Sequence, residues 1–358
     1  MTDRLGRLLD VAAAMGAEAA VVTHPANRHY FSGFPAEDHA PDESSGIMLV
    51  SQGAVELFVS PTNRPKAEAA VHSSITVRPW VRPWQSFVAK RFREIGVRRV
   101  LFEDHAMNVF DHAAVLAAAE DVELIPAGSA LQTVRAIKES EELESITEAA
   151  RITDAAFLSA TTGLAAGVTE RELAWRLESA MRELGANGSA FPTSVASGPH
   201  AARPHHDATN RALEAGEPIV IDLGAVYNGY SADLTRTIVI GDPSSAFIER
   251  YAIVLDAERS ALSGIRPGMT GRASDQIARD VIIAAGYGDN FVHGLGHGVG
   301  LLIHEYPSLG VSSEDHLEPD HVVTIEPGIY LEGWGGIRIE DLCVVTQTGL
   351  DVLSKAPK

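Results

Sequence analysis

The first 130 residues alternate short apolar runs with segments of helical periodicity. Short apolar runs are typical of buried strands, and helices alternate their apolar and polar positions over each turn. We expect strands at 17–23, 46–50, 55–60, 74–77, 97–102 and 122–125. We expect helices at 4–15, 65–71, 84–95 and 110–119. Strands that alternate with helices predict an α/β layer domain.

Residues 126–140 fit a domain boundary followed by the start of a new helix. We therefore expect an N-terminal domain at 1–130 and a second domain at 131–358. Both lengths lie within the usual range for domains.

The second domain contains a weak internal repeat. Gly167-Val-Thr and Gly268-Met-Thr each open a predicted helix, and these helices stop near Gly185 and Gly286. Both intervals span 18 residues, and the two units are offset by 101 residues. A His-containing segment and acidic strands follow each helix. The repeat predicts an α+β domain of two similar halves, with a functional site where the halves meet.

The composition narrows the class of protein and partner. Among the 358 residues, acidic residues outnumber basic ones by 48 to 29, so the formal net charge is −19. That charge repels a phosphate backbone and argues against a nucleic-acid partner. The single cysteine, Cys343, cannot form an internal disulfide and suits a reducing compartment. With no apolar secretion segment and no long apolar stretch, we expect a soluble, cytoplasmic protein without a membrane partner.

The most informative segment is 219–240. Asn228-Gly229 lies between two apolar, β-branched runs and predicts a hairpin with a two-residue type I′ turn. In that register Gly224 opposes Asp233, and Asp222 lies diagonally from Asp233 on the same face, about 7–8 Å away at Cα. Gly224 leaves room between the two carboxylates.

Asp222 and Asp233 therefore form a candidate metal site. Two ionised carboxylates this close repel each other unless a proton or cation lies between them, and a divalent metal is the strongest stabiliser. The alternative is that both are polar residues on a solvated strand face. The nearly continuous apolar sequence around them favours burial, where an unpaired charge is costly.

Two glutamates also end apolar strands, where a charged residue has no packing role. Glu326 precedes Pro327-Gly328, which forces the chain to leave the strand, and Glu340 ends the run that begins at Gly336. Carboxylates combined with an imidazole suit two ions of the Mn, Co, Fe or Zn kind, and the cysteine count excludes a thiolate zinc site.

The segment 293–305 supplies the imidazole. His293 and His297 have the spacing of a zinc-protease helix, but no Glu lies between them. Four glycines fall in the same run, and each disfavours a helix by about 1 kcal/mol. An extended or looped segment is therefore predicted.

The ordered set Asp222, Asp233, His297, Glu326 and Glu340 resembles the metal ligands of the pita-bread metallopeptidases. The surrounding sequence is closer to the aminopeptidase P and prolidase branch. The blocks that carry this resemblance are Val195 to His206, Asp222-Leu-Gly with Asp233-Leu-Thr-Arg-Thr, His293 to Glu305, Thr324-Ile-Glu-Pro-Gly and Gly336 to Asp341.

The resemblance covers about residues 135–358, and Asn27-Arg-His-Tyr-Phe-Ser-Gly33 is similar to the creatinase-type N-terminal domain of the same branch. It implies a creatinase-like α/β N-terminal domain and an α+β pita-bread catalytic domain with pseudo-twofold duplicated halves.

The resemblance also implies two divalent metal ions, of Mn, Co or Zn. Asp222 would bind one ion, His297 and Glu326 the other, and Asp233 and Glu340 would bridge the pair. A hydroxide held between the ions would be the nucleophile, and Glu326 could act as general base.

Further site residues are assigned by the same resemblance. His205 and His304 match positions near the scissile amide, where they would stabilise the oxyanion or protonate the leaving nitrogen. His293 matches a position that lines the substrate pocket. Arg338 could anchor a substrate carboxylate or orient the metal-bridging residues. Glu305 is interpreted as support without a chemical role.

Several neighbouring residues have a structural interpretation. We take His200, His206 and His321 to be structural or surface residues. Tyr227 and Tyr230 could close over the site or could pack the hairpin.

The implied activity is hydrolysis of the N-terminal Xaa-Pro bond in dipeptides or short peptides, by a protein that resembles homodimeric relatives. One alternative is a metal-dependent amidohydrolase of the same fold that acts on a non-proline small molecule, similar to ectoine hydrolases. Another is a non-catalytic binding protein on the pita-bread fold, but the complete ligand set argues against it.

Overall fold

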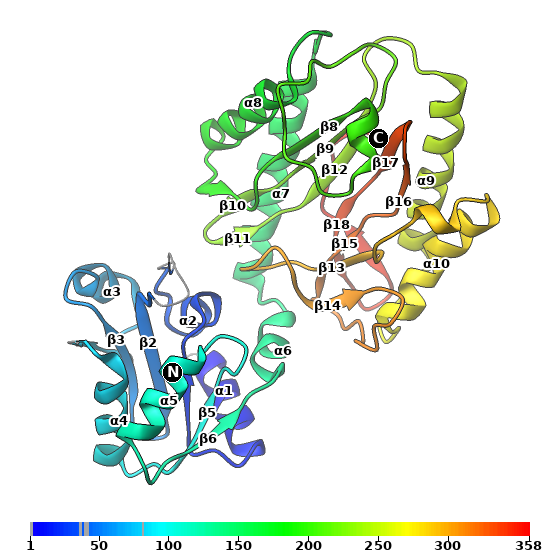
Figure 1. The fold of residues 1–358 in the computed structure, drawn as a ribbon. Helices are drawn as coiled ribbons and strands as arrows, with labels where there is room; N and C mark the ends of the chain where they lie inside the picture. The colour runs from blue at the N-terminus through cyan, green and yellow to red at the C-terminus, as the bar shows by residue number, and fades with distance from the viewer. Residues whose placement is uncertain (1–2, 36–37, 39–42, 81) are drawn as a thin grey trace. The chain divides into compact units, whose positions relative to one another are not determined.

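The computed structural model describes residues 3–35, 38, 43–80 and 82–358, and the chain divides into two compact units (Figure 1). The units are Met1–Arg135 and Ala136–Lys358. Helix α6 (Ala130–Ala136) contains this division, and the boundary expected from the sequence lies at the start of the same helix.

In the described part of the N-terminal unit, six strands form one mixed sheet in the order β4-β3-β2-β1-β5-β6. The strands are β1 (Ala19–Val22), β2 (Gly46–Ser51), β3 (Val55–Val59), β4 (Thr76–Pro79), β5 (Arg99–Phe102) and β6 (Glu123–Pro126). The helices are α1 (Asp3–Ala14), α2 (Pro25–Ser32), α3 (Arg64–Ala70), α4 (Trp84–Ile95) and α5 (Val109–Ala118). Every predicted strand and helix is present, so the predicted α/β class is confirmed.

Helix α2 is one element that the sequence pattern does not predict. It is only 8 residues long, and most of them are buried, including the polar Asn27 and Arg28. A helix without a polar face shows no amphipathic period. Its ends are instead defined locally, because the His24 side chain caps its first turn and Gly33 ends it in the left-handed conformation.

The C-terminal unit, whose residues are all described, consists of strands between two pairs of helices. The helices are α7 (Ser140–Thr161), α8 (Glu170–Glu183), α9 (Ser245–Gly264) and α10 (Gly271–Ala284), with short 3-10 turns η1 (Gly198–Ala202) and η2 (Gly288–Asn290). The first-half strands are β7 (Gly188–Ser189), β8 (Ser194–Ser197), β9 (Ile219–Leu223), β10 (Ala225–Tyr227), β11 (Tyr230–Ser231) and β12 (Leu234–Ile238). The second-half strands are β13 (Gly296–Gly298), β14 (Glu305–Leu309), β15 (Val322–Ile325), β16 (Gly328–Leu331), β17 (Gly335–Arg338), β18 (Asp341–Val345) and β19 (Leu350–Val352).

Each pair of helices covers the strands of its own half (Figure 1). The first-half sheets have the orders β12-β9-β8 and β11-β10-β7, and the second-half sheets have the orders β14-β13-β15-β18-β19 and β16-β17. Leu177 of α8 belongs to a buried cluster with Ile221 of β9, and Ile282 of α10 belongs to one with Ile325 of β15. The strands therefore lie inside the unit, where their ends can carry a buried site.

The two halves repeat the same backbone pairing before their second helix. Gly167 N donates to Leu213 O at 2.9 Å, and Gly268 N donates to Leu317 O at 2.7 Å. Helices α8 and α10 then each begin after a threonine N-cap and contain 14 residues. The predicted duplication of the domain is thus confirmed in its hydrogen bonds.

The acidic hairpin has the predicted register. Asn228 and Gly229 have φ values of 51° and 86°, as a type I′ turn requires, and Leu234 pairs with Leu223. Both strands are interrupted at Gly224 and Asp233. A Cβ atom on Gly224 would collide with the Ala232 carbonyl oxygen, so the glycine is needed for close backbone approach as well as for space between carboxylates.

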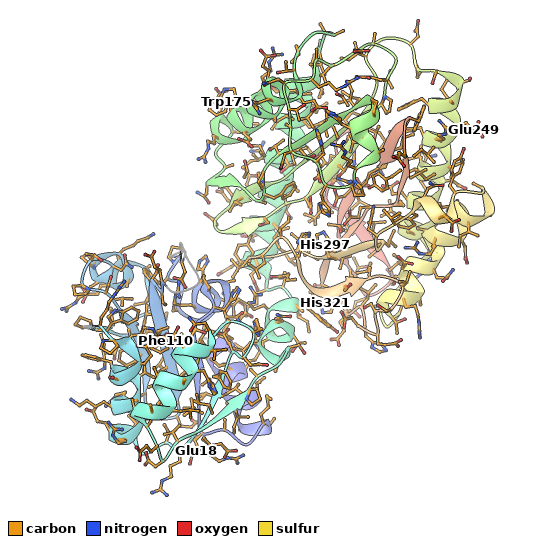
Figure 2. All side chains as sticks on the ribbon, in the orientation of Figure 1. Glu18, Phe110, Trp175, Glu249, His297 and His321 are labelled. Atoms are coloured by element: carbon orange, nitrogen blue, oxygen red, sulfur yellow. The ribbon has the colours of Figure 1, made fainter. Side chains whose placement is uncertain are left out.

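The surface carries isolated large apolar side chains. Phe110 on α5 and Trp175 on α8 are exposed, whereas His297 lies among the strands of the C-terminal unit (Figure 2). Within the described residues, no helix has the length and apolar character needed to span a bilayer. Cys343 is a free, buried thiol on β18.

Candidate metal centre

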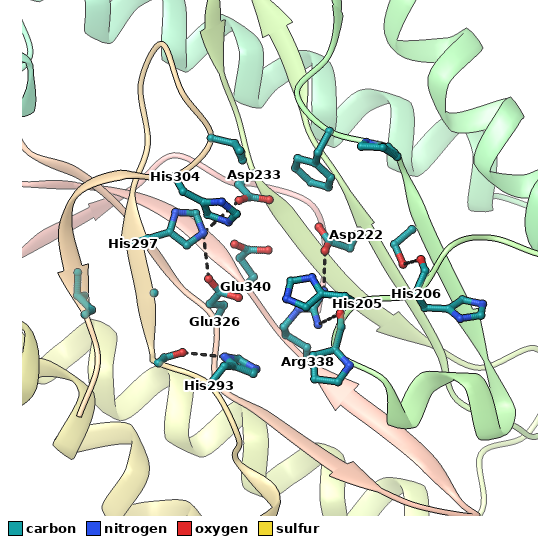
Figure 3. A pocket seen from close by; sticks show the side chains of 18 of the residues that line it. His205, His206, Asp222, Asp233, His293, His297, His304, Glu326, Arg338 and Glu340 are labelled. Carbon is teal, nitrogen blue, oxygen red and sulfur yellow. Dashed lines mark hydrogen bonds and ion pairs between the residues drawn. The ribbon is translucent and has the colours of Figure 1, made fainter. Parts of the chain in front are cut away.

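A cavity of about 420 Å³ opens between the two halves of the C-terminal unit (Figure 3). Strands from both halves bring charged side chains into it, and apolar side chains complete its wall. Its lining includes all of the metal-ligating, catalytic and substrate-binding residues expected from the sequence: His205, Asp222, Asp233, His293, His297, His304, Glu326, Arg338 and Glu340.

The five expected metal ligands come from five separate places in the fold. Asp222 lies on β9 and Asp233 directly precedes β12, whereas His297 lies in β13. Glu326 follows the last residue of β15, and Glu340 lies between β17 and β18. Strand ends from both halves therefore meet at one side of the cavity (Figure 3).

His297 lies beside three of the four carboxylates. Its Nε2 is 3.3 Å from Glu326 Oε1 and 3.6 Å from Asp233 Oδ2. Ligand atoms of Asp233, His297 and Glu340 all lie within 4.8 Å of one another. That spacing is compact enough for one cation to contact several of them.

The orientation of His297 also suits a metal ligand. Its Nδ1 lies 3.1 Å from Gly298 O, and because a carbonyl can only accept, Nδ1 carries the proton. When the ring is neutral, as a metal ligand must be, its lone pair therefore lies on Nε2, the nitrogen that faces the carboxylates. The Thr324 hydroxyl accepts a hydrogen bond from the backbone N–H of His297 and donates one to Glu326 Oε1 at 3.0 Å. The Thr324 side chain thus positions both His297 and Glu326.

The carboxylates destabilise each other in the absence of a cation. Burial, followed by the charges of neighbouring carboxylates, raises the pKa of Asp233 and of Glu340 well above the ordinary values. Burial also raises the pKa of Asp222, although Arg338 opposes it. Asp222 Oδ1 is buried and has no hydrogen-bond partner among the described residues. A cluster of this kind with an unused oxygen fits divalent metal ions.

His297 and Glu326 form the exception to this trend. Burial, the largest single effect, opposes the charge of each, but the hydrogen bond between them and the neighbouring charges together outweigh it. The pKa of His297 is therefore raised, and the pKa of Glu326 is lowered to about 2. Glu326 is therefore a carboxylate at neutral pH.

Arg338 is engaged by the protein on three sides. Its Nη2 donates to Asp222 Oδ2 at 2.6 Å, and its Nε donates to Thr235 Oγ1 at 3.0 Å. Its Nη1 donates to Pro204 O at 3.1 Å and to the Tyr330 hydroxyl at 2.9 Å. Of the two roles expected for Arg338, these contacts favour orientation of the cluster over capture of a substrate carboxylate.

His293 is connected to Arg338 through Tyr330. The Nδ1 of His293 donates to Gly294 O at 2.7 Å, so its Nε2, 2.8 Å from the Tyr330 hydroxyl, accepts a hydrogen bond. Burial lowers the pKa of His293 and raises the pKa of Tyr330 to about 12. Tyr330 is not among the site residues expected from the sequence, although its place four residues after Glu326, on the adjoining β16, is a signal for it.

His205 and His304 lie at the cavity on exposed segments. The ring of His304 meets the ring of His297 edge-on, with 4.4 Å between centroids. Burial, and then the charge of His297, lowers the pKa of His304. His205 lies on the other side of the cavity, near Asp222 (Figure 3).

The two tyrosines of the hairpin lie away from the described lining of the cavity. The Tyr230 hydroxyl donates to Glu142 Oε1 of α7 at 3.0 Å, and Tyr227 packs in the same apolar cluster. Their contacts are those of hairpin packing, the second of the two interpretations.

A second cluster holds the segment that carries His205. The fully buried Glu170 accepts hydrogen bonds from His200 Nδ1 and His206 Nε2, both at 3.0 Å. It also accepts from the backbone N–H and the hydroxyl of both Ser197 and Thr209. Six donors saturate this carboxylate, so His200 and His206 have the structural roles expected of them.

Replacing Glu170 with Gln is expected to destabilise the protein by about 3 kcal/mol at pH 7. Burial opposes ionisation, but hydrogen bonds from Thr209, His206 and Ser197 lower the pKa of Glu170 to about 2. A lowered carboxyl pKa stabilises the fold above the unfolded value and is lost as pH falls through the folded value. Urea unfolding between pH 7 and pH 3.5 should therefore show a loss that shrinks below about pH 4.5. Glu183→Gln, exposed on the same helix, is the control, and an equal loss at every pH would contradict the prediction.

Comparison with known proteins agrees with this architecture. Residues 144–347 match Metallopeptidase family M24, and residues 4–137 match the Creatinase/Prolidase N-terminal domain. An Xaa-Pro dipeptidase of Pyrococcus furiosus is 35% identical over 363 residues, which cover 100% of this chain and 99% of that protein.

Two solved structures are similar over nearly the whole chain. The Xaa-Pro dipeptidase from Bacillus anthracis has a TM-score of 0.94 and 36% identity, covering 99% of this chain and 98% of that one. The X-Pro aminopeptidase from Thermotoga maritima MSB8 has a TM-score of 0.88 and 34% identity, covering 97% and 98%.

Proposed function

The chain belongs to metallopeptidase family M24, with a creatinase-type N-terminal domain and a pita-bread catalytic domain, and from this premise we propose that it hydrolyses the N-terminal Xaa-Pro bond of short peptides. The convergence of four carboxylates and one imidazole on a single cavity carries this proposal. The proline preference is supported by relatives described as Xaa-Pro dipeptidases and as an X-Pro aminopeptidase.

We propose that the cluster holds two divalent ions. Asp222 would bind one ion, His297 and Glu326 the other, and Asp233 and Glu340 both. Carboxylate oxygens with one imidazole suit Mn, Co or Zn. When bound, such ions polarise a carbonyl and make water acidic enough to attack it near neutral pH.

Side chains that line the cavity then accept and donate the protons of the reaction. Hydrolysis adds water to the carbonyl carbon, breaks the C–N bond and delivers a proton to the proline nitrogen. Glu326, ionised and held by Thr324 and His297, accepts the proton that the attacking water loses. His304 and His205, on opposite sides of the cavity, donate a hydrogen bond to the carbonyl oxygen or supply the one proton that the leaving nitrogen needs.

The remaining side chains that line the cavity determine which substrates fit. His293 is neutral and engaged at both ring nitrogens, so it contributes a fixed wall rather than a proton. Phe191, Ile303 and Leu309 provide apolar surface in the same cavity. A proline amide has no N–H, so apolar contacts with its ring suit its recognition.

Chelator-stripped protein should be inactive and should recover activity with Mn, Co or Zn on Xaa-Pro substrates. The panel contains Xaa-Pro dipeptides, Xaa-Pro-Yaa peptides, matched Xaa-Ala peptides and ectoine, with the metal content measured beside each rate. Restored cleavage of Xaa-Pro over Xaa-Ala supports the proposal. Failure on every peptide despite bound ions would refute it, and hydrolysis of ectoine alone would establish the amidohydrolase alternative.

We further propose that the protein acts as a cytoplasmic homodimer. The buried single thiol, Cys343, is consistent with a reducing compartment. Sedimentation equilibrium of the metal-loaded protein measures the assembly, and a monomer at working concentration would contradict it.

A further inference from the structure

A buried ion pair lies next to one of the two histidines assigned to the scissile amide. Lys138 Nζ is 2.7 Å from Glu305 Oε1, and the two side chains are 1% and 4% exposed. Glu305 directly follows His304 in the chain. Its carboxylate points into the protein, whereas His304 is exposed at the cavity. Whatever fixes Glu305 therefore limits where His304 can lie.

The loop that carries His304 is closed around the Glu305 carboxylate. It joins β13 to β14 and contains Gly300, where a Cβ atom would collide with Glu305 Oε1. Gly300 O accepts a hydrogen bond from Ser231 N of β11 at 2.8 Å. One side of the loop is thus bound to the acidic hairpin, and the other is bound through Glu305.

Lys138 is itself held firmly. Its backbone N donates to Asp320 O at 2.9 Å, and its Nζ also donates to Ala136 O at 3.1 Å. The nearby His321 is neutral, because burial and then the charge of Lys138 lower its pKa to about 4. Among the residues that the structure describes, Glu305 is the carboxylate in ion-pair contact with this buried ammonium.

A pair of this kind is a poor source of stability. Removing two charges from water costs several kcal/mol per ion, and well-packed apolar replacements of buried pairs are often neutral or stabilising. The pair instead fixes an orientation, because a charge-assisted hydrogen bond holds the Glu305 carboxylate in one place. In a well-packed apolar pair no such constraint would act on the neighbouring histidine.

We propose that Lys138 and Glu305 are positioning residues for the reaction, which hold His304 against His297 and over the metal cluster. This inference rests on the proposed function of His304. It predicts that the pair affects turnover more than substrate affinity or folding, because His304 acts on the developing charge rather than on the bound ground state.

The test compares five variants of the full chain loaded with metal: His304→Ala, Glu305→Gln, Lys138→Met, Lys138→Arg and the double variant Lys138→Met/Glu305→Met. For each, kcat and KM on an Xaa-Pro-Yaa peptide, metal content and melting temperature are measured. Glu305→Gln and Lys138→Met should lower kcat about 10- to 100-fold, the range for residues that orient ligands, with KM and metal content nearly unchanged. Lys138→Arg, which keeps the charge, should recover most of kcat.

The double variant separates positioning from stability. It should melt at or near the parent temperature, yet its kcat should remain as low as that of Glu305→Gln. Parental kcat in the double variant would overturn the inference. The inference would also fail if kcat falls only in those variants that melt at a lower temperature, and by an amount that follows the loss of stability. Glu305→Gln keeps the side-chain shape and decides the matter if the double variant does not fold. Glu148→Gln, whose partner Arg151 is exposed, is the control for removal of an ion pair.

His304→Ala separates this inference from the function on which it rests. If His304→Ala lowers kcat but Glu305→Gln does not, the positioning role fails alone. If His304→Ala keeps parental kcat, the role of His304 fails and the inference fails with it.

Discussion

Replacing Asp233 with Asn is expected to abolish peptidase activity and dinuclear metal binding together. Asp233 is 6% exposed, and its carboxylate lies 3.6 Å from His297 Nε2 and close to Glu340. Asn keeps the size of the side chain but removes the charge and one ligand oxygen. Because metal polarisation supplies several kcal/mol, the loss of kcat/KM should be about 10³-fold or more.

The same change should have the opposite effect on the metal-free fold. The buried carboxylates around Asp233 repel one another, so a neutral Asn should leave the melting temperature of the metal-free protein equal or higher. Added metal should raise the melting temperature of the parent by mass action and should raise that of the variant much less. Calorimetry with and without metal measures both effects.

Asp242→Asn is the matched control, because Asp242 is an exposed aspartate in the turn after the acidic hairpin. It should leave the activity, the bound metal and the melting temperature unchanged. Asp233→Asn with two bound ions and parental turnover would overturn the bridging assignment.

Replacing Arg338 with Lys is expected to lower kcat about 10²-fold and to weaken metal binding. The Arg338 side chain reaches Asp222, Thr235 and Tyr330 with a planar fork, and a lysine ammonium cannot contact all three. Asp222 would then lose the donor that holds its Oδ2, while its buried Oδ1 has no hydrogen-bond partner among the described residues. Orienting partners of metal ligands typically contribute 10- to 100-fold to affinity or activity.

Steady-state kinetics separates the two roles considered for Arg338. An orienting residue lowers kcat and metal content together, whereas a residue that only anchors the substrate carboxylate raises KM and spares both. A rise in KM alone would therefore contradict the orienting role. Arg272→Lys, at an exposed ion pair with Glu314, is the control and should change neither quantity.

The acidic hairpin was predictable because its signals are local. Asn228-Gly229 favours one turn type, and that turn sets the register in which Asp222 and Asp233 share a face. Alternating apolar runs and helical periods likewise predicted the elements of the N-terminal domain. Helix α2 was not predicted because it is buried on nearly all sides and has no periodic polar face.

By itself, therefore, the sequence determined most elements of the N-terminal domain, the hairpin register, the repeat and, through its family resemblance, a candidate set of metal ligands. Only the tertiary structure decided which side chains the candidate site residues contact. Arg338 meets Asp222 across 116 positions, and Lys138 meets Glu305 across 167. Periodicity and turn chemistry act over a few residues, whereas these contacts exist because strands and loops distant in sequence pack together. For that reason Arg338 was left with two roles, Glu305 with none, and Tyr330 and Lys138 with no place in the predicted site.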